Sequence, residues 1–170
     1  MRTYDFEHDK LTFFLCVLSS CSLRGNWASG SVLNDLLAQL LIKNSDGSYS
    51  TTGEYQAYKY YADMTGSPCS TTSGSSIDSY ATASTNNATA LIGSQFFNGT
   101  VNTVFKGIST QFGSATTLQA SLYNIPYNSG NAVTGWTLSK TQKLTVSSNQ
   151  ATLSFSVVNG NDAWAVRLTT

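Results

Sequence analysis

The sequence has little charge of either sign. Charged residues make up 11% of the 170 residues, and nine Lys and Arg balance nine Asp and Glu. A protein that neutralises the phosphates of a nucleic acid needs clustered cations. The cations here are scattered, and in the second half only Lys140 and Lys143 lie close together. We therefore expect no nucleic-acid partner.

Cysteine and histidine are also scarce. The chain has three cysteines, Cys16, Cys21 and Cys69, and one histidine, His8. None of the cysteines falls within residues 77–170, so a fold in that region does not depend on a disulfide framework. Their spacing matches no zinc pattern. We expect no metal site and no cofactor.

The sequence lacks an apolar run long enough to cross a membrane. The run Leu11–Leu18 resembles the core of a signal peptide, but it follows the acidic residues Asp5, Glu7 and Asp9 where a signal peptide is basic, and it is too short for a bilayer. We interpret the run as a buried strand left over from a larger domain, or as a product of how the start of the gene was assigned. Residues 1–25 are thus an uncertain segment without a convincing signal peptide, and we expect no membrane partner.

Apolar residues, by contrast, make up 41% of the chain, which is enough to bury the core of one ordinary domain with a small appendage. The polar surface must come from the many Ser, Thr and Asn residues, a composition typical of secreted proteins. Two N-glycosylation patterns begin at Asn87 and Asn98. The sequence therefore predicts a secreted glycoprotein, provided that its source is eukaryotic.

Residues 26–67 read as two helices. Within 30–43, five leucines recur at the spacing of one helical face; they are Leu33, Leu36, Leu37, Leu40 and Leu41. Turn-forming residues 44–47 end this helix, and Thr51 with Glu54 has the form of a capping box opening a second helix over 53–64. That helix carries a stripe that should bury against a neighbour, formed by Tyr55, Tyr58, Tyr61 and Met64. Two such faces exceed what a short hairpin can bury, so we infer that the helices evolved to pack against something larger.

Residues 77–170 show the alternation of half-buried antiparallel strands, after a Ser/Thr/Gly-rich linker at 68–76. The expected strands are 77–82, 89–97, 100–108, 117–124, 134–138, 142–146, 151–157 and 164–168. Asn98-Gly99 predicts a hairpin between two of them, and 159–162 joins the last two similarly. About eight short strands with regular turn signals predict a mainly β fold, an antiparallel β-sandwich preceded by two α-helices.

No catalytic constellation emerges from these residues. Hydrolysis of a glycoside needs two carboxyl groups facing each other across the bond, and residues 77–170 contain only Asp78 and Asp162, about 84 positions apart. Asp162 reads as a turn residue, and Glu54 as a helix cap. No Gly-x-Ser-x-Gly pattern is present. We assign no catalytic residue.

Sugar binding without catalysis needs only an exposed aromatic ring with polar groups nearby. Trp164 alternates with the predicted core and should be buried, and Tyr123 also lies in a predicted strand. Tyr127 and Trp136 flank the polar stretch 128–131 and are the better carbohydrate-binding candidates, although core packing is the competing explanation.

The stretch from Asp46 to Gly66, DGSYSTTGEYQAYKYYADMTG, resembles the segment that enters the last barrel helix in fungal family-39-like glycoside hydrolases. The tail 161–168, NDAWAVRL, is similar to the last strand of their C-terminal sandwich. The resemblance implies that residues 26–67 are the remnant of a (β/α)8 barrel followed by that sandwich at 77–170. It also implies that Trp27 corresponds to the end of the final barrel strand, where these enzymes place an aromatic under the sugar. No position here matches the family's catalytic acid or nucleophile.

Three hypotheses follow. The chain is the non-catalytic C-terminal accessory part of a secreted glycoside hydrolase-like protein, whose partner is the missing catalytic barrel. Alternatively, it is a free-standing module that binds a polysaccharide or oligosaccharide through Trp136 and Tyr127, whereas Trp27 is a sugar-binding candidate only through the family resemblance. The third hypothesis is a structural cell-surface protein.

Overall fold

A computed structural model describes residues 40–94, 96–129 and 131–170. Cys16, Cys21, Trp27 and the greater part of the first predicted helix lie outside these residues. The described helices are α3 (Gly53–Asp63) and α4 (Ile108–Phe112). The strands are β1 (Leu41–Lys43), β2 (Tyr49–Thr51), β3 (Ser67–Pro68), β4 (Ile77–Ser84), β5 (Asn87–Ser94), β6 (Gly99–Lys106), β7 (Thr117–Ile125), β8 (Thr137–Thr145), β9 (Gln150–Val157) and β10 (Ala163–Thr169).

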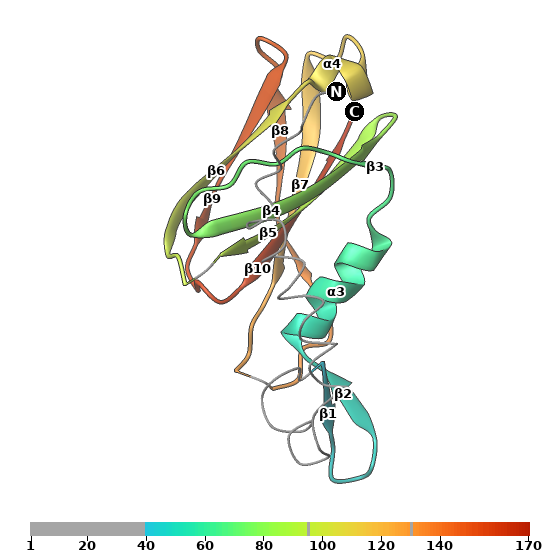
Figure 1. The fold of residues 1–170 in the computed structure, drawn as a ribbon, viewed down its shortest axis with the longest axis vertical. Helices are drawn as coiled ribbons and strands as arrows, with labels where there is room; N and C mark the ends of the chain where they lie inside the picture. Colours follow the sequence, from blue (N-terminus) through green and yellow to red (C-terminus); the bar gives the residue numbers. More distant parts are fainter. Residues whose placement is uncertain (1–39, 95, 130) are drawn as a thin grey trace, which may run out of the picture.

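The strands form an antiparallel sandwich, which confirms the predicted fold class (Figure 1). A six-stranded sheet has the order β3-β4-β5-β10-β7-β8, and a two-stranded sheet, β6-β9, packs against it. The short hairpin β1-β2 projects beyond the sandwich (Figure 1). The two sheets are very unequal in width, so the small sheet covers only part of the large one.

The core between the sheets follows from alternation along the strands. In β9 every second residue is buried and the others are exposed, as expected for a strand with one face on a core. Trp164 is 7% exposed and its ring lies 5.2 Å from that of Phe155, so its expected burial is confirmed. Two strands of the large sheet, β5 and β10, contain three consecutive buried residues each, because both of their faces are covered.

The second covering layer is α3, which lies on the opposite face of the large sheet (Figure 1). Ala57 and Tyr60 pack against Leu91, Ile125 and Ala165, and we call this group the helix-side cluster. The tyrosine-rich helix therefore packs on the sandwich itself. Ala165, which alternates with Trp164 and Val166 along β10, is fully buried on this side of the sheet.

The buried face of α3 differs from the predicted stripe. Gly53, Gln56, Ala57 and Tyr60 are buried, whereas the stripe residues starting at Tyr55 are only half-buried. A spacing of three drifts around a helix of 3.6 residues per turn, so a strict three-residue stripe leaves the contact face. The cap also moves by one residue, because the Thr52 side chain, and not that of Thr51, accepts a hydrogen bond from the Tyr55 amide.

The end of the first predicted helix, at 41–43, is the strand β1. It pairs with β2, and the turn between them is held by the Asn44 side chain, which donates to Ser48 and Ser50. Gly47 adopts a φ of +85° in this turn, a conformation that glycine tolerates without strain. The leucine periodicity over 33–41 thus does not extend as a helix to Lys43.

Two predicted hairpins are wrong, because both turns connect different sheets. Asn98-Gly99 links β5 to β6, and residues 159–162 link β9 to β10, but neither pair of strands is hydrogen-bonded together. A tight hairpin instead joins β4 to β5 at Thr85 and Asn86, where Asn86 has a φ of +58°.

The strands predicted at 134–138 and 142–146 are largely one strand, β8, which has a register shift opposite Leu122 and Tyr123. Turn chemistry identifies a reversal but not which strand pairs next.

The expected linker at 68–76 begins in β3 and continues along β4. The Cys69 amide donates to the Ala81 carbonyl over 2.9 Å, and the Thr71 hydroxyl donates to the Ser79 carbonyl over 2.9 Å. These bonds fix the segment on the edge of the large sheet. No helix among the described residues is long and apolar enough to cross a membrane.

Candidate functional site

Tyr127 and Trp136 lie at the two ends of the connection between β7 and β8, residues 126–136, which we call the 126–136 loop. Hydrogen bonds hold its middle against the end of β2 and the first turns of α3. The Val133 amide donates to the Thr51 carbonyl over 2.7 Å, and the Val133 carbonyl accepts from the Thr51 hydroxyl over 2.6 Å and from Gln56 Nε2 over 3.0 Å. The structure thus brings the two candidate aromatics onto one anchored loop.

Trp136 is half-buried and packs on the helix-side cluster. Its ring meets that of Tyr60 edge-on, with centroids 5.3 Å apart and an angle of 84° between the planes. The Lys59 ammonium lies 5.6 Å from the ring centroid, within range of a cation–π contact. These contacts occupy part of the ring, so Trp136 has a packing role.

Tyr127 is more open, with 48% of its surface exposed. Its backbone amide donates to Asp162 Oδ1 over 2.9 Å. The same carboxylate accepts from Asn124 Nδ2 over 3.0 Å and from Asn159 Nδ2 over 2.9 Å. Asp162 therefore joins the end of β7, the 126–136 loop and the β9–β10 connection, in keeping with its reading as a turn residue.

Sequence reasoning missed two other exposed apolar residues at these connections. Phe96 is 82% exposed and Val158 is 85% exposed. The Phe96 amide donates to the Gly160 carbonyl over 3.0 Å, and a Cβ at Gly160 would overlap the backbone of Phe96. Phe96 also has a φ of +59°, which is rare for a bulky residue. Nothing in the sequence signalled this, because Phe96 falls inside an apolar stretch that predicts a strand.

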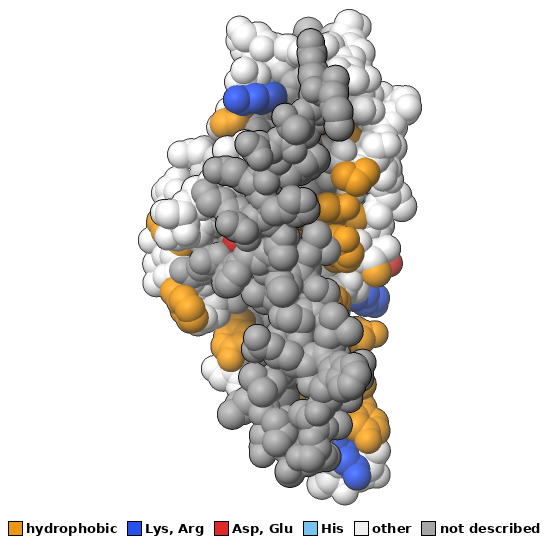
Figure 2. All heavy atoms as spheres, viewed as in Figure 1, with side chains coloured by type: hydrophobic (Ala, Val, Ile, Leu, Met, Phe, Trp, Pro, Cys, Tyr) orange, Lys and Arg blue, Asp and Glu red, His pale blue; other side chains and the backbone are white. Residues whose placement is uncertain are grey.

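The described carboxylates are spread along the fold: Asp46 lies in the β1–β2 turn, Glu54 and Asp63 in α3, Asp78 in β4 and Asp162 in the β9–β10 connection. Hydrogen bonds from the side chain and the backbone of Ser48 lower the pKa of Asp46, which is opposite to what a general acid requires. Glu54 lies in the first turn of α3. Within 40–94, 96–129 and 131–170, no group of three or more His, Cys, Asp or Glu side chains is placed to hold a metal ion. Few of the described side chains visible in Figure 2 are charged.

The two glycosylation candidates differ in their surroundings. Asn98 is exposed in the connection between β5 and β6. Asn87 is the first residue of β5 and is half-buried, and its Oδ1 accepts from Arg167 Nε over 3.2 Å. Asn98 is therefore the more accessible of the two.

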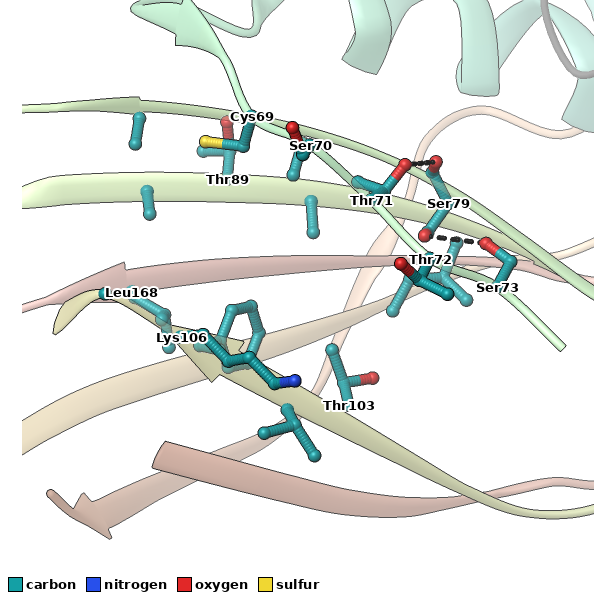
Figure 3. Close-up of a pocket in the computed structure, with 18 of the residues that line it drawn as sticks. Cys69, Ser70, Thr71, Thr72, Ser73, Ser79, Thr89, Thr103, Lys106 and Leu168 are labelled. Carbon is teal, nitrogen blue, oxygen red and sulfur yellow. Dashed lines mark hydrogen bonds between the residues drawn. The ribbon is translucent and has the colours of Figure 1, made fainter. Parts of the chain in front are cut away.

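A cavity of about 750 Å³ lies at one side of the sandwich, and we call it the groove (Figure 3). One wall is the hydroxyl-rich segment 69–74 with Ser79, and the other is the length of β6 from Thr100 to Lys106. Between these walls lie small and apolar side chains of β4, β5 and α4. The thiol of Cys69 lines the groove, and partial burial raises its pKa.

No protein-family model and no curated protein matches the chain. Among solved structures, N2152 from Neocallimastix frontalis superimposes with a TM-score of 0.65 at 21% identity, over 79% of this chain and 33% of that chain. The xyloglucanase of glycoside hydrolase family 44 from Paenibacillus polymyxa gives 0.47 at 17% identity, over 69% and 22% of the two chains. BuGH86 in complex with neoagarooctaose gives 0.43 at 14% identity, over 99% and 28%.

Of these three overlays, only that on N2152 is close enough to establish a shared fold. The chain spans about a third of the length of that structure. The family-39 resemblance stays a prediction.

Proposed function

We propose that this chain is the C-terminal accessory portion of a secreted glycoside hydrolase-like protein and is not catalytic by itself. The observation that carries the proposal is the overlay on N2152, in which most of this chain corresponds to a third of a longer one. The packing of α3 supports it as well. The segment that resembles a last barrel helix leads through β3 directly into the sandwich and lies on its large sheet.

The proposal is tested by the activity of the chain alone and by the gene. We expect no release of reducing sugar when the purified chain is incubated with a panel of plant and fungal polysaccharides. We expect the upstream genomic reading frame to encode a barrel with two glutamates at strand ends. Sugar release by the chain itself, or an intergenic gap with a working promoter upstream, would contradict the proposal.

A second candidate function is carbohydrate binding at the 126–136 loop. Tyr127 favours this function, because its ring is half-exposed while its backbone is fixed by Asp162. Stacking of the ring on a sugar therefore loses little conformational entropy. Trp136 would support the same surface from the other end of the loop. Trp27, the sugar-binding candidate that the family resemblance implies, belongs to the first proposal and lies outside the described residues.

Affinity electrophoresis in soluble polysaccharides tests this second function. We expect Tyr127→Ala to weaken binding about fivefold, because a lost aromatic contact costs on the order of 1 kcal/mol. The matched control is Tyr49→Ala, since Tyr49 is 62% exposed on the β1-β2 hairpin. Equal retardation of the original chain and both variants would exclude the loop as the binding surface.

Secretion and glycosylation belong to the same proposal. In a eukaryotic secretory host we expect Asn98 to carry a glycan more completely than Asn87, because Asn98 is exposed in a connection. Mass spectrometry of Asn98→Gln and Asn87→Gln, before and after glycan removal, measures the occupancy of each site. Full occupancy at Asn87 with none at Asn98 would contradict this order.

A further inference from the structure

The edges of the large sheet discourage further pairing, but the free edge of β6 does not. At one end of the large sheet, β3 has two residues and includes Pro68; at the other, β8 carries Lys140 and Lys143. Short length, proline and lysine all protect an edge strand. In contrast β6 has eight residues, no proline, and a single charge at its last residue, Lys106. Among the described residues β6 pairs only with β9, so the backbone groups on its other side have no strand partner there.

The groove lies beside that free edge. Residues Thr100 to Lys106 of β6 line it consecutively, and no residue of β9 does. Figure 3 shows Thr103 and Lys106 of β6 across the groove from Cys69, Ser70 and Thr71. The space next to β6, between the two layers of the sandwich, is therefore open in the described part of the chain.

The large sheet presents small side chains to this space. Ala81 and Ala83 of β4 and Ala88 and Ala90 of β5 line the groove. The inter-sheet core beyond the groove contains much larger side chains, such as Phe155 and Trp164. A layer of alanines leaves volume that large apolar side chains from an added strand would fill.

The chain contains one segment that fits this space. Leu11–Leu18, LTFFLCVL, is eight residues long, equal to β6, and has no charge, glycine or proline. Its alternate residues Leu11, Phe13, Leu15 and Val17 would form a large apolar face in an extended strand. The 21 residues from 19 to 39 span up to roughly 70 Å when extended, which is ample to reach the groove from Leu40.

We propose that Leu11–Leu18 docks in the groove as a third strand on the free edge of β6. Its backbone pairs with β6, and one of its faces packs on the alanines of β4 and β5. The docking would bury a segment whose sequence favours a buried strand. It would also extend the smaller sheet of the sandwich from two strands to three. It does not depend on the proposed enzymatic context, because it concerns only contacts within this chain.

Amide hydrogen exchange of the full chain, measured by NMR, tests the docking. Half of the β6 amides point away from β9, and only a further strand protects them. We expect every β6 amide to exchange slowly, and Phe13→Asp with Leu15→Asp to speed alternate β6 amides by on the order of a hundredfold. Leu23→Asp, outside the run, is the matched control. Fast alternate β6 amides in the unchanged chain, or protection that the double variant retains, would overturn the proposal.

A spin label keeps the test decisive if the double variant fails to fold. Cys16 lies within the segment, so a nitroxide can be attached there after Cys21→Ser and Cys69→Ser. We expect it to broaden the resonances of β6 and β4 while those of β8, at the far end of the large sheet, stay sharp. If β6 and β4 stay as sharp as β8, the segment does not occupy the groove.

Discussion

Gly53 begins α3 at a point with no room for a side chain. A Cβ at Gly53 would collide with the carbonyl oxygen of Pro126 at the start of the 126–136 loop. Alanine normally favours a helix over glycine by about 1 kcal/mol, but the collision is with backbone and must displace the loop. We expect Gly53→Ala to lower the free energy of unfolding in urea by about 1–3 kcal/mol. Gly74→Ala, where a Cβ meets nothing within 4 Å, should be close to neutral.

We expect Tyr60 to make the folded protein less stable at alkaline pH. Burial, followed by the neighbouring Tyr123, raises the pKa of Tyr60 to about 12, and Arg167 partly opposes the rise. In the unfolded chain the pKa of a tyrosine is near 10. Below that pH Tyr60 is protonated in both states and its contribution to stability is fully present. As the pH rises from about 10 to about 12 the unfolded chain ionises first, so the folded protein loses stability. We expect a loss of about 2 kcal/mol from this group over that window.

Tyr60→Phe should remove this part of the alkaline loss, as measured by urea unfolding at several pH values. The substitution deletes only a long hydrogen bond, 3.4 Å from the hydroxyl to the Val166 carbonyl, so stability at neutral pH should change little. Equal alkaline losses in the variant and the original chain would rule out Tyr60 as the cause.

At the scale of elements, α3 depends on its cap. The Thr52 hydroxyl accepts from the Tyr55 amide, and Thr52 is 4% exposed. We expect Thr52→Ala to cost about 1–2 kcal/mol in urea unfolding, whereas Thr52→Ser retains the hydroxyl and most of the stability. If serine proved as costly as alanine, the methyl group rather than the cap would be what matters.

Elements were predictable from sequence where the signal is local. The turn formers at 44–47 and the capping-box pattern of Thr51 and Glu54 located α3 to within a residue. The alternation over 151–157 located β9. The pairing of strands was not predictable, because Asn98-Gly99 marks a reversal without stating which sheet the next strand joins. The same limit applies to the 126–136 loop, since flanking polar residues cannot reveal that α3 covers Trp136.

At the scale of the molecule, both buried clusters share one sheet. On β10, Trp164 and Val166 face the inter-sheet core and Ala165 faces α3. We therefore expect α3 and the sandwich to unfold together. Trp136 reports on the α3 side of the sheet and Trp164 on the inter-sheet core. A variant with Trp27→Phe and Trp164→Phe keeps only Trp136, and one with Trp27→Phe and Trp136→Phe keeps only Trp164. The fluorescence of these two variants should give coincident urea transitions. An earlier transition at Trp136 would show that α3 detaches first.

The sequence predicted the sandwich because its period-two alternation is strong, yet it could not reveal the unequal widths of the sheets. That inequality arises from which strands pair, a property of contacts between residues as distant as Gly99 and Val157. The groove therefore had no sequence signal of its own, although Leu11–Leu18 drew attention as a strand without a place.

The position of β10 bears on how the protein is made. Of the described strands it is the last to leave the ribosome, yet it lies in the middle of the large sheet, between β5 and β7. Those two strands cannot join into one sheet until β10 arrives between them, so the large sheet closes only after residues 163–169 have emerged. A ribosome that stalls before residue 163 would release a chain with two unjoined sheet halves and exposed apolar faces, a ready substrate for chaperones and proteases.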